Sequence, residues 1–179
     1  MAAWIARSLQ CIWLACRSAE VHDDAAVRNF FARRQSSANA GGQQLRIAQV
    51  IKVENTSTLG RFNGTRSFHI NPMEAHQRHC DTLLFHGCPD AVAANIQATG
   101  LLLSHAGNGM LGRGLYGAPD PRKSLQYCRT QDKFMFICRF NLSNARHAGP
   151  STRHQNSVFD EFCVYEERHV VVLWMLKLA

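Results

Sequence analysis

Short stretches of alternating hydrophobic and polar residues follow one another along the chain, mostly after residue 44. In residues 45–53, the apolar residues Leu45, Ile47, Ile51 and Val53 all occupy odd-numbered positions. In a strand these positions lie on one face, so the pattern predicts a half-buried strand. Other short runs are rich in β-branched and aromatic residues, which favour strands. These runs lie at residues 82–85, where the strand ends on His86 and Gly87, and at 115–116, 134–140, 161–165 and 169–176.

Two segments have the pattern of helices. Asp90–Thr99 reads as a helix that is closed by Gly100. Asp120 and Pro121 supply an N-cap and a first-turn proline for a short helix that runs through Tyr127. Many short strands and few helices indicate an α+β fold built on antiparallel sheets, rather than a doubly wound parallel sheet.

The first forty residues differ from the rest of the chain. Residues 1–19 contain Arg7 and Arg17 but no acidic residue, which fits a mitochondrial presequence, a short signal segment or a docking helix. The alternative is a poorly ordered N-terminus. Residues 35–44 are small and polar and predict a linker. No run approaches the roughly 18 uncharged apolar residues of a transmembrane helix, so no membrane span is expected.

Composition and charge exclude some classes of protein. The 179 residues are 46% hydrophobic and 18% charged, which is too apolar for an intrinsically disordered chain. The net charge of +7 divides into +5 for residues 1–80 and +2 for residues 81–179. Because the basic residues form no block interleaved with aromatic residues, the charge does not by itself identify a nucleic-acid surface.

The seven cysteines favour a reducing compartment. Their number is odd and no C-x-x-C occurs, so we expect free thiols and a location in the cytoplasm or nucleus. One group of histidines and cysteines suggests a metal site but lacks the spacing of a zinc finger, so we expect no metal. This group consists of His76, His79, Cys80, His86 and Cys88.

Three polar residues lie where a predicted strand meets a loop. His86 follows an apolar strand and precedes Gly87, which lets another molecule approach the backbone. Tyr116 follows a glycine-rich turn, and Glu161 opens an apolar run, where a charge needs a partner. Taken singly, each residue is typical of an ordinary structural role.

These residues lie, in order, within three longer strings. The strings are LLFHG (83–87), GRGLYGAPDPRKSLQYC (112–128) and FDEFCVYEERHVVVLWMLKL (159–178). Together they resemble the three blocks of the poly(ADP-ribose) polymerase catalytic domain, a family that uses a His-Tyr-Glu triad. The strand IAQVIKVEN (47–55) also resembles the entry strand of that domain. The resemblance covers roughly residues 44–179, which we expect to form the catalytic domain behind an N-terminal extension and linker, residues 1–43.

The resemblance implies an ADP-ribosyltransferase fold, in which two packed, mainly antiparallel sheets surround an NAD cleft. It implies that His86 hydrogen-bonds the ribose hydroxyls of NAD. The Gly87 backbone would hold the carboxamide of nicotinamide, and Ser124 would bond the same carboxamide.

The resemblance also implies roles around the nicotinamide ring. Tyr127 would stack on the ring, Tyr116 would line its other side, and Glu161 would bond the 2′-OH of the nicotinamide ribose as the catalytic acid. A carboxylate at that position suits the oxocarbenium-like sugar that forms when the glycosidic bond breaks. The expected site is therefore catalytic His86, Tyr116 and Glu161, with His86, Gly87, Tyr116, Ser124 and Tyr127 binding NAD.

The function implied is an NAD-dependent ADP-ribosyltransferase that uses NAD as co-substrate, needs no metal and releases nicotinamide. The acceptor would be a protein side chain, on the chain itself or on another protein, with a nucleic-acid end as an alternative. The interval from Tyr127 to Glu161 is 34 positions, shorter than in members that elongate chains. The short interval favours mono-ADP-ribosylation.

Some positions depart from the family pattern. Cys88 stands where the family commonly has Thr or Ser, and a thiol forms weaker hydrogen bonds than a hydroxyl. Gly117 replaces an aromatic residue and Pro119 a polar one, which would make that wall of the pocket smaller. The departures at Cys88 and Gly117 leave open a weakened or inactive module that binds NAD or ADP-ribose. A third alternative is a structural or interaction domain whose basic N-terminal half docks a partner.

Overall fold

The computed structural model describes residues 21–35, 44–67, 81–129, 131–150, 152 and 158–179. Its helices are α2 (Asp24–Gln35), α3 (Thr56–Ser67), α4 (Asp90–Thr99) and α5 (Pro121–Leu125), with short 3₁₀ turns η2 (Leu103–His105) and η3 (Glu167–His169). Its strands are β1 (Ile47–Lys52), β2 (Asp81–Cys88), β3 (Asn108–Gly109), β4 (Gly112–Arg113), β5 (Leu115–Gly117), β6 (Phe134–Asn141), β7 (Arg146–Ala148), β8 (Glu161–Val164) and β9 (Val170–Leu178).

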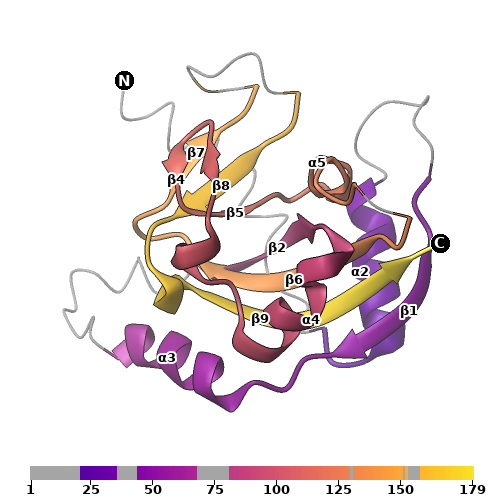
Figure 1. The fold of residues 1–179 in the computed structure, drawn as a ribbon, viewed down its shortest axis with the longest axis horizontal. Coiled ribbons are helices and arrows are strands. Elements are labelled where there is room, and N and C mark those ends of the chain that lie inside the picture. Colours follow the sequence, from indigo (N-terminus) through magenta and orange to yellow (C-terminus); the bar gives the residue numbers. More distant parts are fainter. Residues whose placement is uncertain (1–20, 36–43, 68–80, 130, 151, 153–157) are drawn as a thin grey trace.

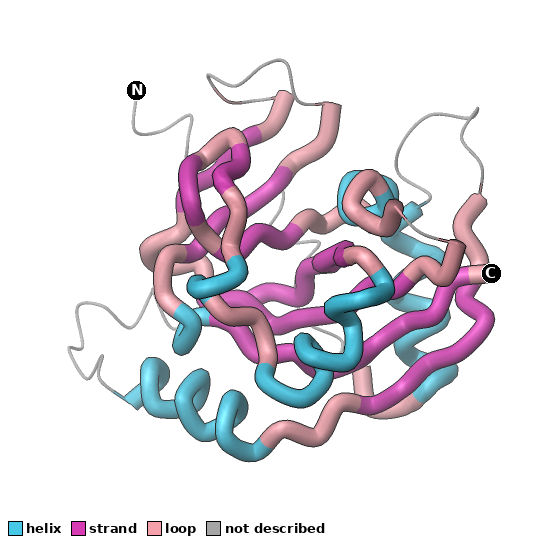
Figure 2. Tube along the Cα trace, in the orientation of Figure 1, coloured by secondary structure: helices cyan, strands magenta, loops and turns pink. Residues whose placement is uncertain are grey.

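The strands form two antiparallel sheets and a small hairpin, with the helices around them (Figures 1 and 2). The larger sheet has the order β1-β9-β6-β2, the smaller has the order β5-β8-β7, and β3 pairs with β4. Phe85 and Ala118 join the two sheets through reciprocal backbone hydrogen bonds of 2.8 and 2.9 Å. The prediction of an α+β fold with antiparallel sheets is confirmed.

The large sheet is buried on both faces. On one face, the smaller sheet and α4 cover a core that includes Leu84, Phe136 and Phe140. On the other face, α2 packs Phe30 and Phe31 against Phe85 of β2. Because both faces exclude water, β6 and β9 are almost continuously apolar rather than alternating.

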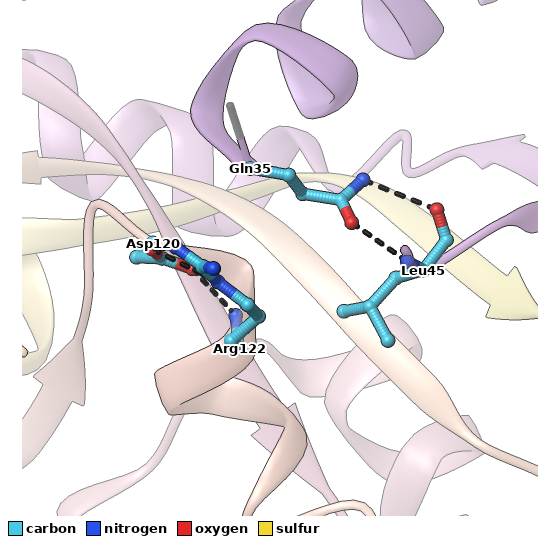
Figure 3. A network of polar contacts seen from close by, with 4 residues as sticks. All are labelled: Gln35, Leu45, Asp120 and Arg122. Atoms are coloured by element: carbon cyan, nitrogen blue, oxygen red, sulfur yellow. Dashed lines mark hydrogen bonds and ion pairs between the residues drawn. The ribbon is translucent and has the colours of Figure 1, made fainter. Parts of the chain in front are cut away.

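Helix α2 lies inside the segment that the sequence suggested as an extension and linker. It is held to Leu45, just before β1, by two hydrogen bonds (Figure 3). The Gln35 amide donates to the Leu45 carbonyl at 3.1 Å, and the Leu45 N–H donates to Gln35 Oε1 at 2.7 Å. The proposed helix and leader roles of residues 1–19, and most of the linker, lie outside the described residues. A domain boundary at residue 44 stays a prediction.

Several elements differ from the sequence expectation. β2 does not end at His86: His86 and Gly87 lie inside the strand and pair with Phe136 and Met135 of β6. α5 ends at Leu125, before Tyr127. α3 was not expected, because its two glycines and low apolar content give a poor helix pattern. Packing against η3 and β9 stabilises it instead.

None of the helices in the described part of the chain is both long enough and apolar enough to span a membrane.

Candidate active site

A cavity of about 610 Å³ opens where the edge of β2 meets β5, α4 and α5. It is lined by every residue that the sequence proposed for the site: His86, Gly87, Tyr116, Ser124, Tyr127 and Glu161. The segment from Gly100 to Gly109, which follows α4, forms another wall. Residues that are far apart in sequence thus meet around one space of the size that holds a small-molecule ligand.

His86 is fixed in one tautomer by its neighbour on β5. Its Nδ1 lies 2.9 Å from the carbonyl oxygen of Tyr116. Because a carbonyl only accepts, Nδ1 carries the proton and donates, which leaves Nε2 as an acceptor. Burial lowers the pKa of His86, so the imidazole is neutral at neutral pH. The ring therefore offers an acceptor to a ligand hydroxyl.

Gly87 presents backbone polar groups to the open edge of β2. The N–H and C=O of Phe85 bond Ala118, on the side of β2 away from β6. Because backbone groups two residues apart on a strand point to the same side, the N–H and C=O of Gly87 face that side too. The N–H and C=O of Gly87 together can form paired hydrogen bonds with the oxygen and the N–H of a planar carboxamide.

Only glycine fits at position 87. A Cβ there would lie 1.9 Å from the carbonyl oxygen of Ser124, in α5. We expect Gly87→Ala to lower the free energy of unfolding by about 1–3 kcal/mol, because the helix must move away from the strand. Chemical denaturation of the full chain measures this effect.

Gly107→Ala is the matched control for that substitution. Gly107 also lines the cavity, but a Cβ there has no neighbour within 4 Å. Its free energy of unfolding should stay within about 0.5 kcal/mol of the wild type. Equal stabilities of the two variants would contradict the close packing of α5 on β2.

Tyr116 contributes a ring whose hydroxyl is already engaged. Its hydroxyl donates to the Gly112 carbonyl at 2.6 Å and accepts the Leu111 N–H at 2.9 Å. Burial is the main cause that raises the pKa of Tyr116, so the phenol stays neutral. A Cβ at Gly109 would lie 2.6 Å from the ring, so the β3–β4 hairpin packs closely over it. Tyr116 is suited to shape the cavity rather than to transfer a proton.

Helix α5 positions Ser124 and Tyr127. The Asp120 carboxylate caps the helix by accepting the Arg122 N–H at 2.9 Å and also pairs with the Arg122 guanidinium (Figure 3). The buried Ser124 hydroxyl donates to the Phe85 carbonyl at 2.8 Å, which leaves its oxygen free to accept. Tyr127, beyond the end of the helix, is 42% exposed, as a ring at the mouth of a cavity would be.

Glu161 is a buried carboxylate with a cationic partner. It begins β8, is 3% exposed, and its Oε2 lies 3.5 Å from Lys123 Nζ. The sequence indicated that this charge needs a partner, but it did not identify Lys123. The available signal was the position of Lys123, directly before Ser124 on the helix that was expected to line the site. Both groups line the cavity, so the pair faces any ligand there.

Two positions that depart from the family pattern are buried. Burial raises the pKa of the Cys88 thiol to about 12, so it lines the cavity as a neutral group. A Cβ at Gly117 would lie 2.8 Å from the Phe140 ring and 2.9 Å from Leu84 Cβ. Core side chains therefore occupy the space that a side chain at position 117 would take.

The possible zinc cluster gains no support in the described part of the chain. There, no three His, Cys, Asp or Glu side chains are grouped so that they could hold a metal ion. His76, His79 and Cys80 lie outside the described residues.

Comparison with known families identifies a match for this chain. The family described as poly(ADP-ribose) polymerase catalytic domain matches residues 22–157. The match includes α2 and the first two of the three strings, and it ends four residues before Glu161. A comparison with curated proteins finds no match.

Proposed function

The chain belongs to the poly(ADP-ribose) polymerase catalytic-domain family and has its ADP-ribosyltransferase fold, and from this premise we propose that it transfers single ADP-ribose units from NAD to protein side chains. The observation that carries the proposal is the buried Glu161–Lys123 pair in the same cavity as His86 and the Gly87 backbone. Members of this family use NAD as a substrate.

In the proposed reaction, the cavity first orients NAD. The N–H and C=O of Gly87 and the Ser124 hydroxyl hold the nicotinamide carboxamide, while the rings of Tyr116 and Tyr127 lie on either side of the nicotinamide. His86 Nε2 accepts a hydrogen bond from a ribose hydroxyl. Fixing the carboxamide and the ribose at separate points aligns the bond that breaks.

The chemical step exchanges one bond at the ribose anomeric carbon for another. The bond to the nicotinamide nitrogen breaks, its electron pair stays on that nitrogen, and nicotinamide leaves as a neutral molecule. The sugar passes through an oxocarbenium-like state, which the Glu161 carboxylate stabilises. The nucleophilic atom of the acceptor side chain then bonds the anomeric carbon, and its proton is lost to Glu161 or to water.

Lys123 pairs with Glu161 at the start of this sequence. Burying an isolated carboxylate that is 3% exposed would be costly, and a cation at 3.5 Å offsets that cost. Because Glu161 is the group proposed to stabilise the developing cation, we include its partner Lys123 in the proposed catalytic machinery.

The short interval between Tyr127 and Glu161 supports transfer of single units. Its 34 positions hold β6, β7 and the connection to β8, which leaves little chain to bind a growing polymer. The alternative of a weakened NAD-binding module rests on Cys88, whose thiol forms only weak hydrogen bonds with a ribose hydroxyl, and on Gly117. A nucleic-acid acceptor and a location in the cytoplasm or nucleus also stay predictions.

Incubating the full chain with NAD labelled in its adenylate half tests the proposal. We expect label on protein, release of nicotinamide, and single ADP-ribose units on modified side chains by mass spectrometry. Long ADP-ribose chains would contradict the mono-transfer proposal. Saturable NAD binding without transfer would support the weakened module instead.

A further inference from the structure

The segment that follows α4 forms one wall of the cavity but has little regular structure. Leu102, His105 and Asn108 line the cavity, and the 3₁₀ turn η2 begins directly after Leu102 and ends at His105. We call residues 102–108 the wall loop. Its backbone must be held in place if the cavity is to keep one shape for a ligand.

The 3₁₀ turn η2 in the wall loop has no local side-chain N-cap. The residue before η2, Leu102, has an apolar side chain and makes no side-chain cap. The Leu103 N–H instead donates to Glu167 Oε1 at 2.8 Å, a residue 64 positions away in η3. A charged acceptor on a backbone N–H is among the stronger hydrogen bonds in proteins. Glu167 therefore does for η2 what a local N-cap does for an ordinary helix.

A second charged residue holds the other side of the same turn. Arg113 of β4 donates through Nη2 to the Leu103 carbonyl at 3.1 Å and to the Ser104 carbonyl at 3.4 Å. The turn is thus held by an anion at its N–H and by a cation at its carbonyls. Glu167 is itself oriented by Arg61 of α3, whose Nη1 lies 3.4 Å from Glu167 Oε2.

We propose that Glu167 is a positioning residue that fixes the wall loop and thereby sets the affinity of the cavity for NAD, an inference that rests on the proposed function. Glu167 does not line the cavity, so it acts through the Leu103 backbone. The reacting groups, with Glu161 foremost, lie on other elements. Loss of the Glu167 contact should therefore weaken NAD binding and leave the chemical step nearly unchanged.

The test compares Glu167→Ala with Glu166→Ala in the full chain. Glu166 is the adjacent carboxylate and pairs with Arg168 at 2.7 Å across an exposed surface. We expect Glu167→Ala to raise KM for NAD about tenfold, the scale of one charge-assisted hydrogen bond, with kcat within about twofold. Glu166→Ala should leave both constants at the wild-type values.

Glu167→Gln distinguishes positioning from a general effect on stability. Its amide oxygen can still accept the Leu103 N–H, so we expect it to restore most of the NAD affinity. If Glu167→Ala does not fold, a KM raised several-fold in Arg113→Gln would support the proposal instead. A raised KM in Glu166→Ala equal to that in Glu167→Ala, or a fall in kcat with unchanged KM, would overturn it.

Amide hydrogen exchange separates a failure of this inference from a failure of the proposed function. Exchange at Leu103 should be faster in Glu167→Ala than in Glu166→Ala, whether or not the chain uses NAD. If the wild type neither binds nor turns over NAD, the proposed function fails and the NAD part of this inference fails with it. If amide exchange at Leu103 is unchanged by Glu167→Ala, the inference that Glu167 holds the wall loop through the Leu103 N–H is wrong.

Discussion

Glu161→Gln is expected to reduce ADP-ribose transfer by about 100-fold or more, the usual scale for removing one group that stabilises transition-state charge. The amide nearly matches the carboxylate in size and can still accept a hydrogen bond from a ribose hydroxyl. It carries no negative charge, so it cannot stabilise the oxocarbenium-like sugar. Steady-state release of nicotinamide measures the loss, and the fall should be in kcat rather than in KM.

NAD binding separates this effect from damage to the cavity. Calorimetric titration of Glu161→Gln with NAD should give an affinity within about threefold of the wild type, because the contacts of His86 and Gly87 remain. Glu166→Gln is the matched control: it is the same chemical change five positions further along, at an exposed ion pair with Arg168. Unchanged turnover in Glu161→Gln would overturn the assignment of Glu161.

The loss of charge at position 161 also removes the partner of Lys123. The Lys123 side chain is 13% exposed, so its unpaired ammonium is partly desolvated in the variant. We therefore expect a measurable fall in the melting temperature of Glu161→Gln. The double variant Glu161→Gln/Lys123→Met should recover stability without recovering transfer.

The parts of the fold that the sequence predicted are those whose pattern is local. β6 and β9 are long runs of β-branched and aromatic residues, and α4 is bounded by Asp90 and Gly100. The secondary structure of such segments can be predicted from their own residues, without knowledge of tertiary contacts. The six proposed site residues line one cavity. They could be identified from the sequence because each lies in a string that resembles a block of the family's catalytic domain.

The parts that the sequence did not predict depend on contacts between distant segments. α3 has a poor helix pattern and forms where η3 and β9 give it a surface. Glu161 required a cation, but its pairing with Lys123 depends on the fold bringing α5 close to the start of β8. The cap that Glu167 gives to Leu103 spans 64 positions, and nothing near Leu103 in the sequence indicates it.

Helix α2 packs against β2, a strand that is distant from it in the sequence. Phe31 is 2% exposed and meets the fully buried ring of Phe85 edge-on, with centroids 5.7 Å apart. Phe85 is in turn bonded through its backbone to Ala118 and accepts the Ser124 hydroxyl. The helix therefore supports the strand on which the cavity is built, from the face opposite the cavity.

Phe31→Ala is expected to lower the free energy of unfolding by about 3–5 kcal/mol, the range for truncating a buried phenylalanine. Because small domains are stable by only about 5–15 kcal/mol, this is a large part of the total. Asn29→Ala, on the exposed side of the same helix, should change the stability by less than about 0.5 kcal/mol. Urea denaturation of the full chain measures both variants. If α2 were a dispensable extension of a domain that begins at residue 44, the two variants would be equally stable, and that result would contradict the packing of α2 against β2.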